Sequence, residues 1–141
     1  QPEMNAPEVT VKVLAEINNK SADFICLNYA NTDMVGHTGI QSAIIKAVET
    51  ADNCLRQVVE AGIENGYSFV IIADHGNAEK NTNEDGSPNT SHTVNPVPCF
   101  VIDANAIQIK SGKLGDIAPT LLHLMNINQP KEMTGDSLVI K

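Results

Sequence analysis

The feature that most constrains the fold is a short apolar run, S-F-V-I-I-A, at residues 68–73. It is rich in β-branched side chains and apolar on both faces, which is typical of a central strand in a parallel sheet. Asp74, His75 and Gly76 follow it directly. Because ligands of open α/β sheets bind beyond the carboxyl ends of the strands, this run predicts both a buried strand and a polar site at its end.

Helical patterns flank this strand on both sides in the sequence. An apolar stripe over residues 9–17 predicts a helix with Asn5 as its N-cap and Pro7 in its first turn. The alternation V-T-V-K-V inside that stripe leaves a strand as an alternative. A second stripe that begins at Ile40 predicts a long amphipathic helix, closed near Gly62 or Gly66.

Two further strands and one further helix complete the pattern. We expect Asp116 to cap a helix over residues 117–125. The predicted strands lie at 23–29, 68–73 and 98–102, and a polar loop is expected at 77–95. Strands that alternate with helices predict an α/β fold, with a mostly parallel sheet flanked by helices.

Composition limits the classes of partner. A chain of 141 residues suits one domain with a buried core. Its formal net charge of −8 argues against binding to nucleic acid. An anionic small substrate would need metal cations to make the charge at its binding site positive. No apolar stretch approaches the ~20 residues of a membrane span, and the start does not resemble a signal peptide. The chain does not begin with Met, and we expect it to be a piece of something longer.

The cysteines indicate a reducing compartment. Cys26, Cys54 and Cys99 are odd in number, widely spaced and form no C-x-x-C pair. This pattern favours buried free thiols over a disulfide or a zinc site.

Asp33 and His37 form the first group of candidate ligands. They lie four residues apart just after the predicted strand at 23–29, in N-T-D-M-V-G-H-T-G. A helical turn or a compact loop can bring both side chains to one point, and carboxylate and imidazole suit Zn, Mn or Fe. The alternative is that Asp33 caps a helix and His37 is solvated.

Asp74 and His75 form the second group, and His92 is a third candidate. The pair would meet the first group if the two preceding strands lie near each other, or they would merely form a turn with Gly76. His92 lies in a polar loop, where a lone histidine is often on the surface. With Asp33 and His37 it would make a three-ligand site with an open position. His123 lies in an apolar helix, and no chemical role is expected for it.

Several segments together resemble one enzyme family. They are N-T-D-M-V-G-H-T-G, A-D-H-G-N-A-E, T-S-H-T-V-N-P-V-P and D-I-A-P-T-L-L-H-L-M, with M-T-G-D-S-L near the end. They are similar to the carboxyl-terminal part of the cofactor-independent phosphoglycerate mutases, over essentially all 141 residues. The last two segments are also similar to the wider alkaline phosphatase superfamily, whereas the first three, in this order and spacing, are specific to the mutases.

This resemblance implies a site and an activity. Two divalent metal ions are expected, manganese foremost, with magnesium, cobalt or zinc as alternatives. Asp33, His37 and His92 would hold the first ion, and Asp74 and His75 the second. The parent enzyme would be a cytoplasmic isomerase of glycolysis that interconverts 3-phosphoglycerate and 2-phosphoglycerate through a phosphoserine. It would be monomeric, with phosphoglycerate as its small-molecule partner and no nucleic acid or membrane partner.

The resemblance also implies what this chain lacks. In the family, the nucleophilic serine and an aspartate of the second metal site lie in an N-terminal segment, and substrate-binding arginines and a lysine lie there and in an inserted transferase domain. We therefore expect residues 1–141 to be the carboxyl-terminal segment of an incomplete alkaline-phosphatase-like domain, with no catalytic residue and no activity alone. The alternatives are another enzyme of the superfamily, such as a phosphopentomutase or phosphodiesterase, and a non-catalytic module whose Asp and His residues cap loops.

Overall fold

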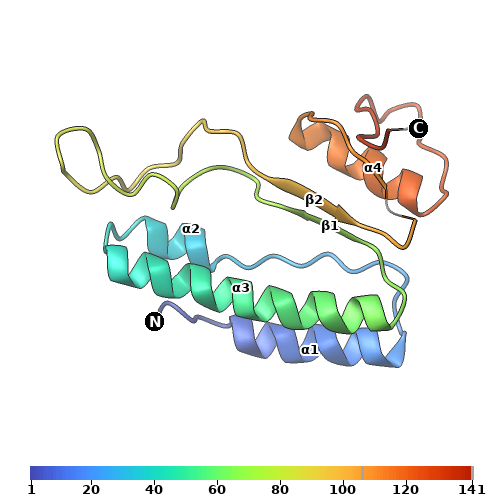
Figure 1. The fold of residues 1–141 in the computed structure, drawn as a ribbon, viewed down its shortest axis with the longest axis horizontal. Helices are drawn as coiled ribbons and strands as arrows, with labels where there is room; N and C mark the ends of the chain where they lie inside the picture. The colour runs from blue at the N-terminus through green and yellow to red at the C-terminus, as the bar shows by residue number, and fades with distance from the viewer. Residues whose placement is uncertain (106, 141) are drawn as a thin grey trace. The chain divides into compact units, whose positions relative to one another are not determined.

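The computed structural model describes residues 1–105 and 107–140. The chain divides into two compact units: residues 1–65 with 75–96 form the first, and residues 66–74 with those from 97 onward form the second. The expected single domain over 1–141 stays a prediction. The elements are α1 (Ala6–Asn19), α2 (Asn31–Gly36), α3 (Gln41–Glu64), β1 (Phe69–Ile72), β2 (Cys99–Ile102), the 3₁₀ turn η1 (Leu114–Asp116) and α4 (Ile117–Leu124) (Figure 1).

Helices α1 and α3 lie side by side and form the body of the first unit (Figure 1). Both were expected from their apolar stripes, and each buries one face. The buried residues are Ala6, Thr10 and Ile17 on α1, and Ile44, Ala47, Thr50, Cys54, Val58 and Gly62 on α3. Asn5 occupies the N-cap position of α1, but its side chain makes no capping hydrogen bond. Helix α3 passes through Gly62 and ends at Glu64, and Gly66 follows with a φ of 84°, so Gly66 is the glycine that terminates it.

The segment at 23–29 is not a strand, contrary to its predicted structure. It runs without regular secondary structure between α1 and α2, and it pairs with no strand among residues 1–105 and 107–140. Phe24 and Cys26 are exposed. Apolar composition alone therefore misled the prediction, because a strand also needs a neighbour to accept its backbone hydrogen bonds. Tyr29 anchors the segment, since its hydroxyl lies 2.6 Å from Oγ1 of Thr10.

Strands β1 and β2 confirm the predicted strands at 68–73 and 98–102, but they pair antiparallel. Phe69 lies opposite Ile102, and Ile72 lies opposite Cys99. The expected parallel arrangement is wrong for this pair, because residues 73–98 return without the crossover helix that a parallel pair requires. The strands are also not covered on both faces, since Ile72 is 39% exposed and Phe100 is 58% exposed. The α/β class itself is confirmed.

Asp116 precedes α4 as predicted, but it bonds to other segments. Its Oδ2 accepts a hydrogen bond of 2.9 Å from the backbone N–H of Lys113, and its Oδ1 accepts one of 3.0 Å from the N–H of Asp136. These bonds lower the pKa of the Asp116 carboxyl. In the same unit, Oγ1 of Thr120 accepts a 2.9 Å hydrogen bond from the N–H of Leu138. The start of α4 therefore holds the C-terminal segment by side-chain hydrogen bonds.

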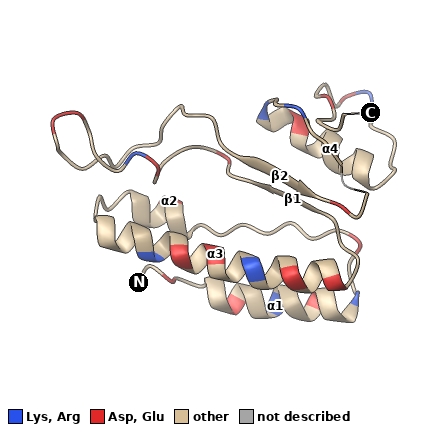
Figure 2. Ribbon diagram, in the orientation of Figure 1, with Lys and Arg blue, Asp and Glu red and all other residues tan. Residues whose placement is uncertain are grey.

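Charges are distributed along the chain without a basic cluster on α1 or α3. Acidic and basic residues are interspersed on both helices, and acidic residues also lie in the long loop after β1 (Figure 2). No helix within the described residues has both the length and the apolar character needed to cross a membrane. The three cysteines are free thiols, but only Cys54 is buried and Cys26 is exposed, so their predicted burial is wrong for Cys26.

Candidate metal centre

Helix α2 positions Asp33 because its other face is fixed to the first unit. Asn31 is 2% exposed, and its amide donates hydrogen bonds of 2.8 Å and 2.7 Å to the carbonyl oxygens of Pro2 and Glu3. Val35 packs in the core against Ile44 and Ala47 of α3. Asp33 lies between these two anchors in the sequence, and its side chain remains partly exposed.

His37 follows at the C-cap of α2, four residues after Asp33. Side chains at this spacing lie on the same face of a helix, as expected from the sequence. Nε2 of His37 lies 3.3 Å from Oδ1 of Asp33. The other ring nitrogen, Nδ1, lies 2.7 Å from the carbonyl oxygen of Thr90.

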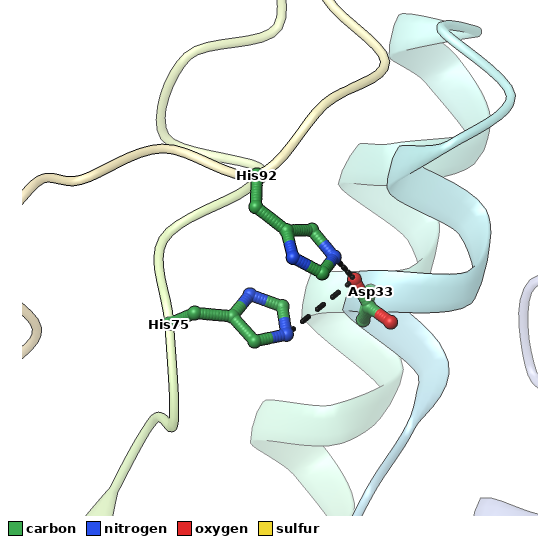
Figure 3. Close-up of side chains that lie close together, drawn as sticks. All are labelled: Asp33, His75 and His92. Atoms are coloured by element: carbon green, nitrogen blue, oxygen red, sulfur yellow. Dashed lines mark hydrogen bonds and ion pairs between the residues drawn. The ribbon is translucent and has the colours of Figure 1, made fainter.

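His75 and His92 reach the same carboxylate oxygen from the long loop after β1. Nε2 of His92 lies 2.9 Å from Oδ1 of Asp33, and Nε2 of His75 lies 3.8 Å from it. The two imidazole rings are stacked, with centroids 3.7 Å apart and planes inclined by 20°. Figure 3 shows both rings pointing toward Asp33 from neighbouring segments of the loop. Three imidazole nitrogens therefore converge on one carboxylate oxygen.

The hydrogen bond between His37 and Thr90 determines whether Nε2 of His37 is a donor or an acceptor. A carbonyl oxygen only accepts hydrogen bonds, so Nδ1 of His37 carries the proton. In the neutral ring, Nε2 is then an acceptor, and it faces another acceptor, Oδ1 of Asp33, at 3.3 Å. A metal cation between the two atoms would be attracted to both of them. A carbonyl partner of this kind is also how proteins orient a metal-binding histidine.

Asn77 completes the surroundings of Asp33. It is 7% exposed, and its amide nitrogen donates a 2.9 Å hydrogen bond to Oδ1 of Asp33. It can approach because Gly36 has no side chain: a Cβ atom there would lie 2.1 Å from Oδ1 of Asn77. Burial opposes ionisation of Asp33, but the hydrogen bonds from Asn77 and His92 and the adjacent His37 outweigh it and lower the pKa of Asp33. The carboxylate is therefore negative at neutral pH.

The donor set fits a divalent metal ion. Ligand atoms bound tetrahedrally at 2.0–2.2 Å from one ion are about 3.3 Å apart. The separations of 2.9, 3.3 and 3.8 Å between Oδ1 of Asp33 and the three imidazole nitrogens bracket this value. One ligand atom from each of Asp33, His75 and His92 can be chosen so that all lie within 4.8 Å of one another. Imidazole nitrogen with carboxylate oxygen suits Zn, Mn and related ions.

Four of the five expected ligands, Asp33, His37, His75 and His92, lie close together, and their role as metal ligands stays a prediction. Of the residues that the resemblance assigned to one ion, His37 and His92 each approach Oδ1 of Asp33, but among the described residues the set whose ligand atoms all lie within 4.8 Å of one another is Asp33, His75 and His92. His75 was assigned to another ion, yet its ring is stacked on His92 and directed at the same oxygen. Asp74 belongs to the second compact unit, so the division of the five residues between two ions stays a prediction.

Sequence reasoning gave no role to Asn77 or Glu79. Both lie in the A-D-H-G-N-A-E segment, two and four residues after His75. The sequence offered only an amide and a carboxylate close to a candidate ligand. This is a weak indication of function, because such residues more often form turns. His123 lies outside the site, as expected, and its Nδ1 is 2.9 Å from Oγ of Ser137.

Comparison with known proteins agrees with this geometry. Residues 1–129 match the family model of the metalloenzyme superfamily. The chain is 55% identical over 140 residues to a 2,3-bisphosphoglycerate-independent phosphoglycerate mutase of Parabacteroides distasonis, and 52% identical over 139 residues to that of Flavobacterium johnsoniae. In each case the match covers 99% of this chain, which spans only 28% of the relative's length.

A solved structure gives the same result for the fold. A crystal structure of phosphoglycerate mutase from Leishmania mexicana at low cobalt concentration matches with a TM-score of 0.88 and 26% sequence identity. The match covers 99% of this chain and 29% of that chain. The converging carboxylate and imidazoles, the family match over residues 1–129 and this likeness agree, and the chain belongs to the metalloenzyme superfamily.

Proposed function

We propose that this chain supplies metal ligands to a metal-dependent phosphoglycerate mutase. The observation that carries the proposal is the convergence of three imidazole nitrogens on Oδ1 of Asp33. The relatives named as phosphoglycerate mutases match nearly the whole chain and favour this activity over the other enzymes of the superfamily. The parent enzyme would interconvert 3-phosphoglycerate and 2-phosphoglycerate through a phosphoserine.

Each ligand would have a defined task. Asp33, His37 and His92 would hold the first ion, and Asp74 and His75 would contribute to the second. The carbonyl of Thr90 orients His37 by accepting a hydrogen bond from Nδ1. Asn77 keeps Oδ1 of Asp33 in place. The bound ions would supply positive charge that offsets the negative charge of a transferring phosphoryl group, which a chain with a net charge of −8 cannot otherwise provide.

We propose manganese as the ion, since mixed oxygen and nitrogen ligands accept it, with magnesium, cobalt and zinc as the competitors. The serine nucleophile and the remaining ligand of the second ion are proposed to lie in parts of the longer enzyme that have no counterpart here. We further propose a monomeric parent that acts in glycolysis in the cytoplasm, with neither nucleic acid nor membrane as a partner.

The ligand assignment can be tested by titrating Mn²⁺ into the chain in a calorimeter, with His37→Ala and Asp74→Ala in parallel. We expect His37→Ala to abolish the tightest binding and Asp74→Ala to leave it. The reverse outcome would show that the assignment is wrong. If the unmodified chain binds no divalent ion at millimolar concentration, the result favours the non-catalytic alternative.

The expected inactivity of the chain alone is tested with 3-phosphoglycerate and Mn²⁺, followed by ³¹P NMR. No 2-phosphoglycerate should form, and its appearance would refute the expectation. Profiling the full-length enzyme against phosphopentoses and phosphodiesters separates the mutase from the other enzymes of the superfamily, because the metal ligands alone do not distinguish them.

A further inference from the structure

Glu79 connects the two loop segments that carry His75 and His92. Its Oε2 accepts a 2.7 Å hydrogen bond from the backbone N–H of Asn77. Its Oε1 accepts a 3.0 Å hydrogen bond from the side-chain amide of Asn95 and another from the hydroxyl of Thr93. One carboxylate therefore holds the residue two positions after His75 together with the residue directly after His92.

We propose that Glu79 is a positioning residue of the metal centre, whose carboxylate fixes the spacing of the His75 and His92 imidazoles. The inference rests on the proposed metal centre and adds a residue that would not bind the ion. It predicts that metal affinity depends on Glu79 even when the fold is intact.

The backbone beside Glu79 shows how closely the two segments are joined. The N–H of Thr93 donates a 2.8 Å hydrogen bond to the carbonyl oxygen of Gly76, in an isolated antiparallel bridge. A Cβ atom on Gly76 would lie 2.1 Å from Oγ1 of Thr93 and 2.4 Å from Oε1 of Glu79. The carboxylate and the hydroxyl thus fill the space that a side chain at residue 76 would need.

This connection is needed because no helix or extended strand carries either histidine. Residues 77–98 form an irregular loop with isolated bridges only. The separation of the two rings, with centroids 3.7 Å apart, must therefore be set by side-chain hydrogen bonds and one bridge. Asn77 extends the connection to the carboxylate ligand, because its side chain donates to Asp33 while its backbone donates to Glu79.

The three groups that donate to residue 79 favour a carboxylate there. A backbone N–H and an amide NH₂ can only donate, and an ionised carboxylate can only accept. The Thr93 hydroxyl, with the other hydrogen bonds, lowers the pKa of Glu79 to about 2, so the side chain is ionised at neutral pH. Glutamine has the same shape, but its NH₂ group would face one of these donors.

The test is the affinity of the 141-residue chain for Mn²⁺, measured by calorimetry for Glu79→Gln and for a matched control, Glu84→Gln. Glu84 is exposed in the same loop, so its replacement removes the same charge. Loss of a group that orients a ligand typically weakens metal binding by 10–100-fold. We expect Glu79→Gln to raise the Kd for Mn²⁺ about 10-fold and Glu84→Gln to change it less than about twofold.

Circular dichroism and thermal unfolding without metal show at which temperature each variant is fully folded, and the titrations are run there. A merely structural role would lower the melting temperature and leave the Kd of the folded chain unchanged, which would overturn the proposal. Equal weakening in both variants would also overturn it, because net charge would then be the cause. If the unmodified chain binds no Mn²⁺, the proposed metal centre itself fails.

A double variant examines the route of the effect. If Glu79 acts through the Thr93 hydroxyl, Glu79→Gln should raise the Kd much less in a Thr93→Val background than in the unmodified chain. Independent, multiplicative effects of the two substitutions would contradict a shared connection.

Discussion

Gly36→Ala should weaken both the fold and the metal centre, although alanine favours a helix. Alanine at a helical glycine usually stabilises by about 1 kcal/mol. Here the added Cβ would lie 2.1 Å from Oδ1 and 2.8 Å from Cγ of Asn77. The amide must retreat by roughly 1 Å, which takes its nitrogen, now 2.9 Å from Asp33, out of hydrogen-bonding range.

The magnitude follows from the two opposing effects. A hydrogen bond to a charged group contributes about 1.5–3 kcal/mol, and the partial exposure of Asp33 places this one at the lower end. Displacing the buried amide of Asn77 adds about 1 kcal/mol or more. After the helical gain is subtracted, we expect the free energy of unfolding to fall by about 1–2 kcal/mol.

Urea unfolding of the metal-free chain, followed by circular dichroism, measures this change. Gly115→Ala is the matched control, because a Cβ there meets nothing closer than Cε of Lys113 at 3.9 Å. In an Asn77→Ala background the clash is absent, so Gly36→Ala should become neutral or stabilising. If it remains equally destabilising there, or is neutral in the unmodified chain, the reasoning about Gly36 and Asn77 is refuted.

Three further predictions concern metal removal, pH and the anchor of α2. Mn²⁺ at 100 times its Kd should raise the free energy of unfolding by about 2.7 kcal/mol, as measured by scanning calorimetry. A chelator should reverse this increase, and His92→Ala should not show it. Because the pKa of Glu79 is lowered from 4.5 to about 2, its contribution to stability is complete above about pH 4.5 and is lost as the pH falls toward 2. Urea titrations at several pH values should therefore show that Glu79→Gln loses less stability over this range than the unmodified chain does. If the free energy of unfolding falls equally steeply with pH in both, the role of this carboxylate is contradicted. Asn31→Ala should lower the free energy of unfolding by about 2 kcal/mol, because two backbone carbonyls lose the hydrogen bonds that the Asn31 amide donates. Asn19 is exposed, and the control Asn19→Ala should have little effect in the same urea titration.

The sequence predicted those elements whose signals are local. Helices α1 and α3 follow from apolar stripes, and Gly66 ends α3 by its positive φ. Strands β1 and β2 follow from short β-branched runs. The failures are non-local: the segment at 23–29 has the composition of a strand but no partner among the described residues, and the direction of β2 depends on the path of the loop before it. Residue patterns alone do not determine such pairings.

The same distinction applies to the site. Asp33 and His37 were predictable as neighbours because a helix places side chains four residues apart on one face. That His92 joins them, and that His75 points at the same oxygen, depends on contacts between residues up to 59 positions apart. Asn77 and Glu79 were missed because their functions depend entirely on what the loop brings near them.

The site therefore combines a carboxylate on a helix with two histidines whose positions depend on how well the loop is ordered. Asp33 is held by α2, whose buried Asn31 and Val35 fix its position before any ion binds. His75 and His92 lie on irregular backbone, where ordering each residue costs about 1–2 kcal/mol of conformational entropy. The hydrogen bonds of Glu79, Asn77 and Thr93 offset part of that cost in advance. An ion that binds to histidines already in place retains more of its coordination energy as affinity, which is why residues that never touch the ion should still control how tightly it binds.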